Sequence, residues 1–195
     1  MSERTMTAVP AVVLAAGGST RCPGGKLTRE FAGRPLLCWT LETLEQSPLV
    51  SSVILVCGFQ RELIARAAEP FGKVRTVSNP VWSEGLASSL RTGIGAVPHS
   101  SPGALVCLAD TPFFKAETLR AVIPVDDLNL VVLPRYQGRH GHPKYFPHRL
   151  FPELLKLKGD EGARSVLSRF KEETRTVELD DPDILKDFDT PEDFS

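Results

Sequence analysis

The chain has 195 residues, of which 42% are hydrophobic and 24% charged. This length and apolar content predict one domain over residues 1–195, with its core at about 9–194, and exclude a disordered or collagen-like chain. Lys and Arg number 23 and Asp and Glu 24, so the net charge of −1 argues against nucleic acid or an anionic membrane as a partner. The sequence shows neither the apolar run of about 20 residues that spans a membrane nor a secretory signal, which predicts a cytoplasmic protein.

Short apolar runs alternate along the chain with segments of helical periodicity. Strands are expected at 11–16, 53–57, 73–77, 104–109, 130–133 and around 175–178. Helices are expected from Pro35 onward and at 60–69, 87–96, 115–123, 147–157 and 161–170. The run at 104–109 is the most continuously apolar, which is typical of a central parallel strand. The segment 135–146 is expected to form a polar hairpin or excursion, because glycines interrupt it.

This alternation of strands and helices favours an α/β fold, an open and mostly parallel Rossmann-like sheet with helices on both faces. Such sheets bind ligands beyond the carboxyl ends of their strands, where the strand order switches. The residues that follow the first, third and fourth expected strands are Gly17, Ser78 with Asn79, and Asp110. A ligand site is therefore expected where these residues meet.

The loop at 17–26 contains four glycines, which allow several backbone N–H groups to converge on phosphate oxygens. Arg21 adds a planar fork of donors and Lys26 a compact positive charge, and both suit a polyphosphate. The loop is not a Walker loop, because Thr20 stands where that motif needs glycine and Leu27 follows the lysine. Phosphate binding is favoured over the alternative, a flexible surface loop.

Three aspartates are candidates for metal binding. Asp110 ends a strongly apolar strand and could hold Mg²⁺, although Asp is equally common as a helix cap or turn former. Asp187 and Asp189 would share one face if their segment is extended. The alternative there is an ordinary helix start at Thr190 and Pro191.

A polar loop after the third expected strand leads into a helix whose first turn carries Ser88 and Ser89. These hydroxyls could meet an anion or a base edge. Trp82, in the same loop, could stack on a ligand or pack in the core. His140 and His142 lie two residues apart, but no third metal ligand can be placed with them, so they are interpreted as polar loop histidines.

Six sequence blocks span nearly the whole chain in a fixed order. They are Leu14-Ala15-Ala16-Gly17-x-Ser19-x-Arg21 with Lys26; Asn79-Pro80-x-Trp82-x-x-Gly85-x-x-Ser88-Ser89-Leu90-x-x-Gly93; Leu108-Ala109-Asp110-Thr111-Pro112; Gly141-His142-Pro143; Gly159-Asp160-x-Gly162-Ala163-Arg164; and Asp187-Phe188-Asp189-Thr190-Pro191-Glu192-Asp193. Together these blocks resemble the MobA/MocA-like nucleotidyltransferase family, whose fold is of the nucleotide-diphospho-sugar transferase type. One departure is Cys22-Pro23-Gly24, where the family usually has Met-Gly after the arginine.

The resemblance implies an enzyme that transfers NMP from an NTP to a phosphorylated acceptor and releases pyrophosphate, with Mg²⁺ as its cofactor. In the branch that the chain resembles most, the molybdenum cofactor cytidylyltransferases, the donor is CTP and the acceptor is molybdopterin. A hand-over of the product to an apo-molybdoenzyme would then follow. Ala16 supports CTP, because the guanylyltransferase branch usually has glycine at that position.

The resemblance also implies roles for individual residues. The catalytic residues are Arg21, Lys26 and Asp110, and the metal ligands are Asp110 and Asp189. The acceptor-binding residues are Ser89 and His142. The nucleotide-binding residues are Leu14, Ala15, Ala16, Gly17, Gly18, Ser19, Arg21, Lys26, Asn79, Gly85 and Ser88.

In the implied reaction an acceptor phosphate oxygen attacks the α-phosphorus in line, so catalysis is mainly positioning and charge neutralisation. Three alternatives stand beside this interpretation: transfer to another small acceptor such as a sugar phosphate, a non-catalytic carrier of a nucleotide-bearing pterin, and a redox enzyme on the same scaffold. A carrier has no need of a metal clamp, so the presence of both Asp110 and Asp189 favours catalysis. No nicotinamide-binding fingerprint supports the redox alternative.

Overall fold

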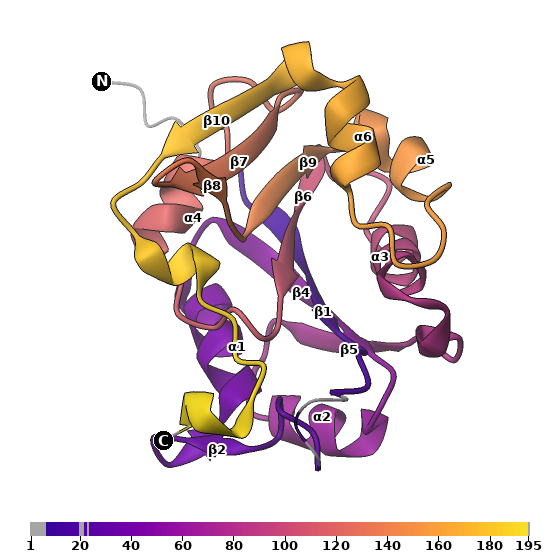
Figure 1. Ribbon diagram of the computed structural model, residues 1–195. Coiled ribbons are helices and arrows are strands. Elements are labelled where there is room, and N and C mark those ends of the chain that lie inside the picture. The colour runs from indigo at the N-terminus through magenta and orange to yellow at the C-terminus, as the bar shows by residue number, and fades with distance from the viewer. Residues whose placement is uncertain (1–6, 20–21, 23, 195) are drawn as a thin grey trace.

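A twisted sheet runs through the centre of the molecule (Figure 1). The computed structural model describes residues 7–19, 22 and 24–194, and within these ranges eight strands form this sheet. Their order is β10-β7-β9-β6-β1-β4-β5, with β8 paired to β7. The strands are β1 (Val9–Ala15), β4 (Val50–Cys57), β5 (Val74–Ser78), β6 (Gly103–Leu108), β7 (Val131–Tyr136), β8 (Arg139–His140), β9 (Lys144–Pro147) and β10 (Thr174–Glu178).

The central strands carry unbroken apolar runs because helices cover both faces of the sheet. β1 pairs in parallel with β4 on one side and with β6 on the other, and β4 pairs in parallel with β5. In β4, Val53 to Cys57 are all buried, so both faces of this strand contact apolar side chains. These features confirm the expected α/β fold with a mostly parallel, open sheet.

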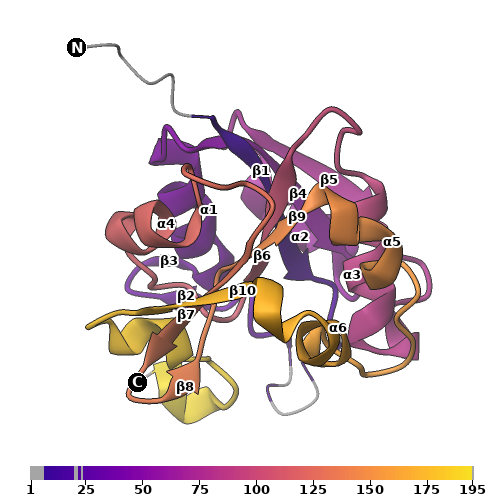
Figure 2. The ribbon, with the colours of Figure 1, turned by 90° about the horizontal axis from the view of Figure 1, so that it is seen from above.

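Helices form one layer on each face of the sheet, as Figure 2 shows from above. One layer holds α1, α2 and α4, and the other holds α3, α5 and α6. The helices are α1 (Leu36–Gln46), α2 (Arg61–Ala68), α3 (Leu86–Gly95), α4 (Ala116–Val122), α5 (Phe151–Leu154) and α6 (Arg164–Arg169). Single 3₁₀ turns are η1 (Trp82–Glu84), η2 (His148–Leu150), η3 (Lys171–Glu173), η4 (Pro182–Leu185) and η5 (Pro191–Phe194).

The segment 135–146 differs from the expected polar excursion. It does form a hairpin, in which β8 pairs with β7, but it then continues into β9, which lies between β6 and β7 and is antiparallel to both. Tyr145 and Phe146 of this strand are fully buried, at 0% exposure. β9 has only four residues and follows a glycine-rich polar stretch, so its short apolar pattern does not show a strand by periodicity. As a result, β6 is parallel to only one of its two neighbours.

Two other stretches are shorter or more structured than expected. The loop before α1 contains a small antiparallel hairpin of β2 (Glu30–Phe31) and β3 (Arg34–Pro35), and Pro35 lies at the N-cap position directly before the helix. The helix expected at 147–157 is divided, because Pro147 ends β9 and η2 precedes the four-residue α5. Short elements of this kind depend on tertiary contacts more than on local propensity.

After β10 the chain turns back across the molecule and ends beside the β2–β3 hairpin (yellow in Figure 1). Phe188, in this returning segment, is fully buried and packs against Phe31 of β2, with ring centroids 5.1 Å apart. This packing fixes the C-terminal segment near the start of the chain. Within the described ranges, no helix has both the length and the apolar character of a membrane span.

Gly93 marks the closest approach of α3 to the sheet. A Cβ atom at this position would clash with Val12 of β1 and lie 3.0 Å from Val56 Cγ2 of β4. Gly93→Ala should therefore lower the free energy of unfolding by about 1–3 kcal/mol through overpacking. Gly95→Ala is the matched control, because its Cβ would meet only Leu155 Cδ2 at 4.0 Å. The control should be neutral or stabilising by up to about 1 kcal/mol, and equal urea midpoints for the two variants would contradict this packing.

Candidate active site

The strand order reverses at β1, since the chain continues from β1 to β4 on one side and returns to β6 on the other. A cavity of about 520 Å³ lies there, at the carboxyl ends of β1 and β6. Many of the residues expected to bind nucleotide, acceptor or metal line this cavity. They are Leu14, Ala15, Ala16, Gly17, Gly18, Ser19, Lys26, Gly85, Ser89, Asp110 and Asp189. The position agrees with the general rule for ligand sites in open α/β sheets.

The centre of the site is a lysine held between two aspartates. Lys26 Nζ donates to Asp110 Oδ2 at 2.6 Å and to Asp189 Oδ1 at 2.8 Å. The three side chains are only 15%, 25% and 24% exposed, respectively, so water screens these ion pairs weakly. Burial by itself lowers the pKa of Lys26, but the two carboxylates outweigh that effect and raise it above its ordinary value. Lys26 is therefore charged throughout the physiological pH range.

Backbone hydrogen bonds bring the two aspartates to this point. Ala109 N–H donates to the Leu14 carbonyl at 3.2 Å, which places Asp110 directly beyond the end of β1. Phe188 N–H donates to the Asp110 carbonyl at 3.0 Å, so the next residue, Asp189, lies beside Asp110. Asp187 is exposed and does not line the cavity. Of the two aspartates that the sequence left open, Asp189 is the one that faces the site.

The 3₁₀ turn after Asp189 keeps its backbone in place. The Asp193 carboxylate accepts from Asp189 N–H at 2.9 Å and from Thr190 N–H at 2.8 Å. These N–H groups hold the pKa of Asp193 below its usual range. The helix start considered from the sequence is thus present as η5, and it occurs together with a cavity-facing Asp189 rather than instead of it.

The carboxylate pair fits a hard divalent cation. Asp110 Oδ2 and Asp189 Oδ1 both lie within 2.8 Å of one nitrogen, so the two carboxylates converge on one point. The described part of the chain contains no group of three His, Cys, Asp or Glu side chains that could hold a metal. Mg²⁺ commonly binds through one or two carboxylates and completes its shell with substrate phosphate and water. The donor set therefore suits an ion that arrives with a nucleotide.

The glycine-rich loop folds back on itself beside this pair. Ser19 has a positive φ of 49°, and its Oγ accepts from Lys26 N–H at 3.3 Å, which closes the loop. Gln60 supports the loop from outside by donating from Nε2 to the Gly24 carbonyl at 2.7 Å. The positive φ of 88° at Gly24 explains the glycine there. Arg21, expected to bind the triphosphate, lies outside the described residues.

Asn79 and Ser88 lie behind the cavity wall rather than on it. Asn79 Nδ2 donates to Ser88 Oγ at 2.8 Å and to Ser89 Oγ at 3.1 Å, while its Oδ1 accepts from Val81 N–H at 3.1 Å. Asn79 and Ser88 are 1% and 2% exposed. They hold the start of α3 against the end of β5, and only Ser89 of the three also lines the cavity.

Two further residues that line the first cavity are Trp82 and Asp160. Trp82 also packs against the core on one side, which confirms the packing interpretation, while its stacking on a ligand stays a prediction. Asp160 Oδ1 accepts from Leu86 N–H at 3.3 Å, which fixes the loop before α6 to the start of α3. The signal for Asp160 was its place in the block at 159–164, which together with the segment 135–146 is expected to shape the choice of acceptor.

A second cavity of about 1470 Å³ adjoins the first. Leu14, Leu86, Leu108 and Asp160 line both cavities, so the two spaces are continuous along the sheet face. His142 lines the second cavity, and its Nδ1 lies 3.3 Å from the Val106 carbonyl. The two residues expected to bind the acceptor, Ser89 and His142, therefore lie in neighbouring cavities.

An open α/β sheet that ends in a glycine-rich loop, a lysine and a carboxylate pair at its switch point defines a nucleotide-binding transferase site. The sequence family described as the MobA-like NTP transferase domain matches residues 11–176. The chain belongs to this MobA-like NTP transferase family and is a nucleotidyltransferase of that type.

Curated relatives match the chain over nearly its whole length. The molybdenum cofactor cytidylyltransferase of Escherichia coli is 24% identical over 190 residues, which cover 97% of this chain and 95% of the relative. The purine catabolism protein PucB of Bacillus subtilis is 28% identical over 193 residues, with 94% and 92% covered.

A solved structure, Rv0371c from Mycobacterium tuberculosis, is similar in fold as well as sequence. It superposes with a TM-score of 0.82 at 29% identity and covers 96% of each chain. Its complex with manganese superposes with a TM-score of 0.78 at 28% identity and covers 97% of each chain.

His142 provides a test of the environment of the second cavity. Burial, followed by the nearby charge of Lys144, lowers the pKa of His142 from 6.5 to about 3. In an NMR titration, the His142 ring signals should stay constant between about pH 5 and 8. The unfolded chain binds more protons than the folded one between these two pKa values, so the free energy of unfolding should fall as the pH drops below about 6.5. A His142 midpoint near 6.5 would contradict this effect of burial and of the Lys144 charge.

Proposed function

We propose that this protein transfers CMP from CTP to molybdopterin, a phosphorylated acceptor, and releases pyrophosphate. The observation that carries the proposal is the contact of Lys26 with Asp110 and Asp189 beside the glycine-rich loop. This contact supports the proposal because one cation and two carboxylates that could hold a metal lie together beside the loop that would bind the triphosphate. The E. coli relative named molybdenum cofactor cytidylyltransferase supports the choice of acceptor and donor.

The proposed roles of the site residues follow from their charges. The loop amides, with Arg21 and Lys26, would hold the triphosphate, because backbone N–H groups and cations together suit its oxygens. Asp110 and Asp189 would hold Mg²⁺. When bound, a divalent ion polarises the α-phosphate and offsets the charge that develops in the transition state. The manganese complex of Rv0371c supports a divalent ion in proteins of this fold.

The acceptor needs no strong general base, since its phosphate oxygen is already anionic near neutral pH. What opposes the attack is the repulsion between two negatively charged phosphates. Lys26 lowers this repulsion, because its ammonium lies at the point where the two carboxylates converge. Binding of the metal and nucleotide requires Lys26 to exchange its carboxylate partners for phosphate oxygens. Positioning and charge neutralisation therefore account for the proposed catalysis.

Lys26→Ala tests the role of the lysine. Turnover should fall on the order of 10²-fold or more, which is typical of removing one transition-state donor. Far-UV circular dichroism should show a folded protein, although loss of the cation between two largely buried carboxylates should lower the free energy of unfolding. Lys158→Ala, which removes an exposed lysine that lines neither cavity, is the matched control. Unchanged turnover in a folded Lys26→Ala protein would count heavily against the assignment.

Pyrophosphate release distinguishes the candidate reactions. The wild-type protein should release pyrophosphate from CTP, and much less from GTP or ATP, only when both Mg²⁺ and molybdopterin are present. Asp110→Asn and Asp189→Asn should abolish the metal-dependent release, whereas Asp187→Asn, two residues from Asp189 and outside the cavity, should retain it. Release with a sugar phosphate instead would show that the acceptor is a sugar phosphate rather than molybdopterin. Absence of release with every acceptor would favour a non-catalytic carrier.

A further inference from the structure

One strand leads from the first cavity into the second. Alternate residues of β6 and its extension face the same side of the sheet. Val106 lines only the second cavity, Leu108 lines both, and Asp110 lines only the first. A ligand that lies along this face would therefore have one end at the carboxylate pair and its other end in the second cavity.

The second cavity is rich in basic side chains. Five Lys and Arg residues line it within the described part of the chain: Arg135, Arg139, Lys144, Arg164 and Lys171. Two acids, Asp160 and Glu161, line the same cavity. Asp160 already accepts a hydrogen bond from the start of α3 and lies at the boundary with the first cavity. The interior of the second cavity is consequently positive.

The cations of this cavity differ in whether a carboxylate neutralises them. Arg135 is paired with Glu178, at 3.0 Å from Nε to both carboxylate oxygens. Lys144, on β9, and Arg164, at the start of α6, form no ion pair with any described carboxylate. Lys144 is half-buried, and burial together with the nearby Arg164 charge lowers its pKa. Two like charges held close together without a partner are a favourable arrangement for an anion.

We propose that Lys144 and Arg164 form an anion-binding subsite that holds a second negatively charged group of the acceptor, remote from its reacting phosphate. This inference rests on the proposed function, which puts the reacting phosphate of the acceptor at the carboxylate pair and the rest of the acceptor toward the second cavity. The acceptor class is thereby narrowed to phosphate esters with a second anionic group, and simple monoesters should be poor substrates.

The register of the sheet sets the spacing between the two groups. Lys144 is paired with Val106 in the antiparallel ladder of β9 and β6. Asp110 follows Val106 by four residues, the last two of which form a turn after the end of β6. The two positions are therefore at most roughly 13 Å apart along the chain, at about 3.3 Å per residue. An acceptor that spans the two cavities should carry its anionic groups at a separation of this order.

A phosphate titration followed by ¹H–¹⁵N NMR tests the subsite without any transfer reaction. Inorganic phosphate should shift the backbone amides of β9 and of residues 160–165 in the wild-type protein. Lys144→Met and Arg164→Met should each weaken this response on the order of 10-fold, the size expected for losing one charge-assisted hydrogen bond. Arg164 is exposed, so its variant should fold even if removal of Lys144 disturbs β9.

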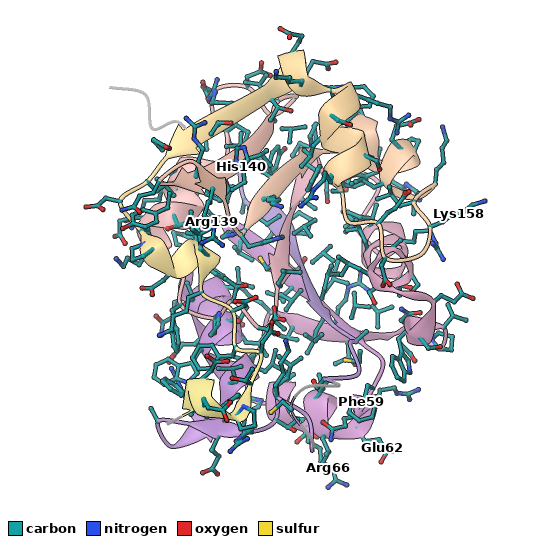
Figure 3. The ribbon with its side chains drawn as sticks, viewed as in Figure 1. Phe59, Glu62, Arg66, Arg139, His140 and Lys158 are labelled. Carbon is teal, nitrogen blue, oxygen red and sulfur yellow. The ribbon has the colours of Figure 1, made fainter. Side chains whose placement is uncertain are left out.

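Each control variant removes one positive charge outside the second cavity. Lys158→Met and Arg66→Met alter exposed side chains that lie away from the cavity, on the α5–α6 loop and on α2 (Figure 3). Both should leave the phosphate response of β9 unchanged, and so should Lys26→Met, which affects only the first cavity. Absence of shifts at β9 in the wild type, or shifts that persist in both Lys144→Met and Arg164→Met, would overturn the subsite.

Transfer kinetics then connect the subsite to the acceptor. In Lys144→Met and Arg164→Met, the KM for molybdopterin should rise on the order of 10-fold while the KM for CTP stays constant. A wild-type protein that transfers no CMP would reject the proposed function, but the phosphate titration would still decide whether the anion subsite exists. An equal rise in both KM values would overturn the assignment of this subsite to the acceptor.

Discussion

The site depends on one electrostatic constraint, the sharing of a lysine ammonium by two carboxylates. Lys26, Asp110 and Asp189 come from the first loop, from the end of β6 and from the C-terminal segment, and they are separated by 84 and 163 residues from the lysine. Two carboxylates this close would repel each other without a cation between them. A ligand that displaces Lys26 must itself supply positive charge, which is the physical reason for proposing a metal-bearing nucleotide at this pair.

The folding of the C-terminal segment determines whether that pair exists. Phe188 is buried in an aromatic cluster with Phe31 and Phe113, and its N–H group bonds to the Asp110 carbonyl. The burial of Phe188 thus fixes the position of the next residue, Asp189, whose carboxylate must stay accessible. The β2–β3 hairpin, which supplies Phe31, supports the active site although none of its side chains lines the first cavity.

The insertion of β9 gives the molecule its second cavity. In a fully parallel sheet a parallel strand would lie beside β6, but here the antiparallel β9 does. This strand and the residues before it bring His142 and Lys144 to the same sheet face as Val106. The nucleotide end of the sheet is built from parallel strands and a glycine-rich loop. The end proposed for the acceptor is built from an antiparallel strand and the start of α6. Under the proposed function, variation in this second half would change the acceptor without altering the carboxylate pair.

Local patterns in the sequence determined the strands of the parallel half, the main helices and the loop at 17–26, because apolar periodicity and glycine content act over short distances. They also indicated Lys26 as a candidate phosphate-binding residue and Asp110 as a candidate metal ligand. Only the tertiary structure decided between Asp187 and Asp189, placed Asn79 behind the cavity wall, and made β9 a central strand. These features depend on which distant segments pack together, and neither periodicity nor propensity carries that information.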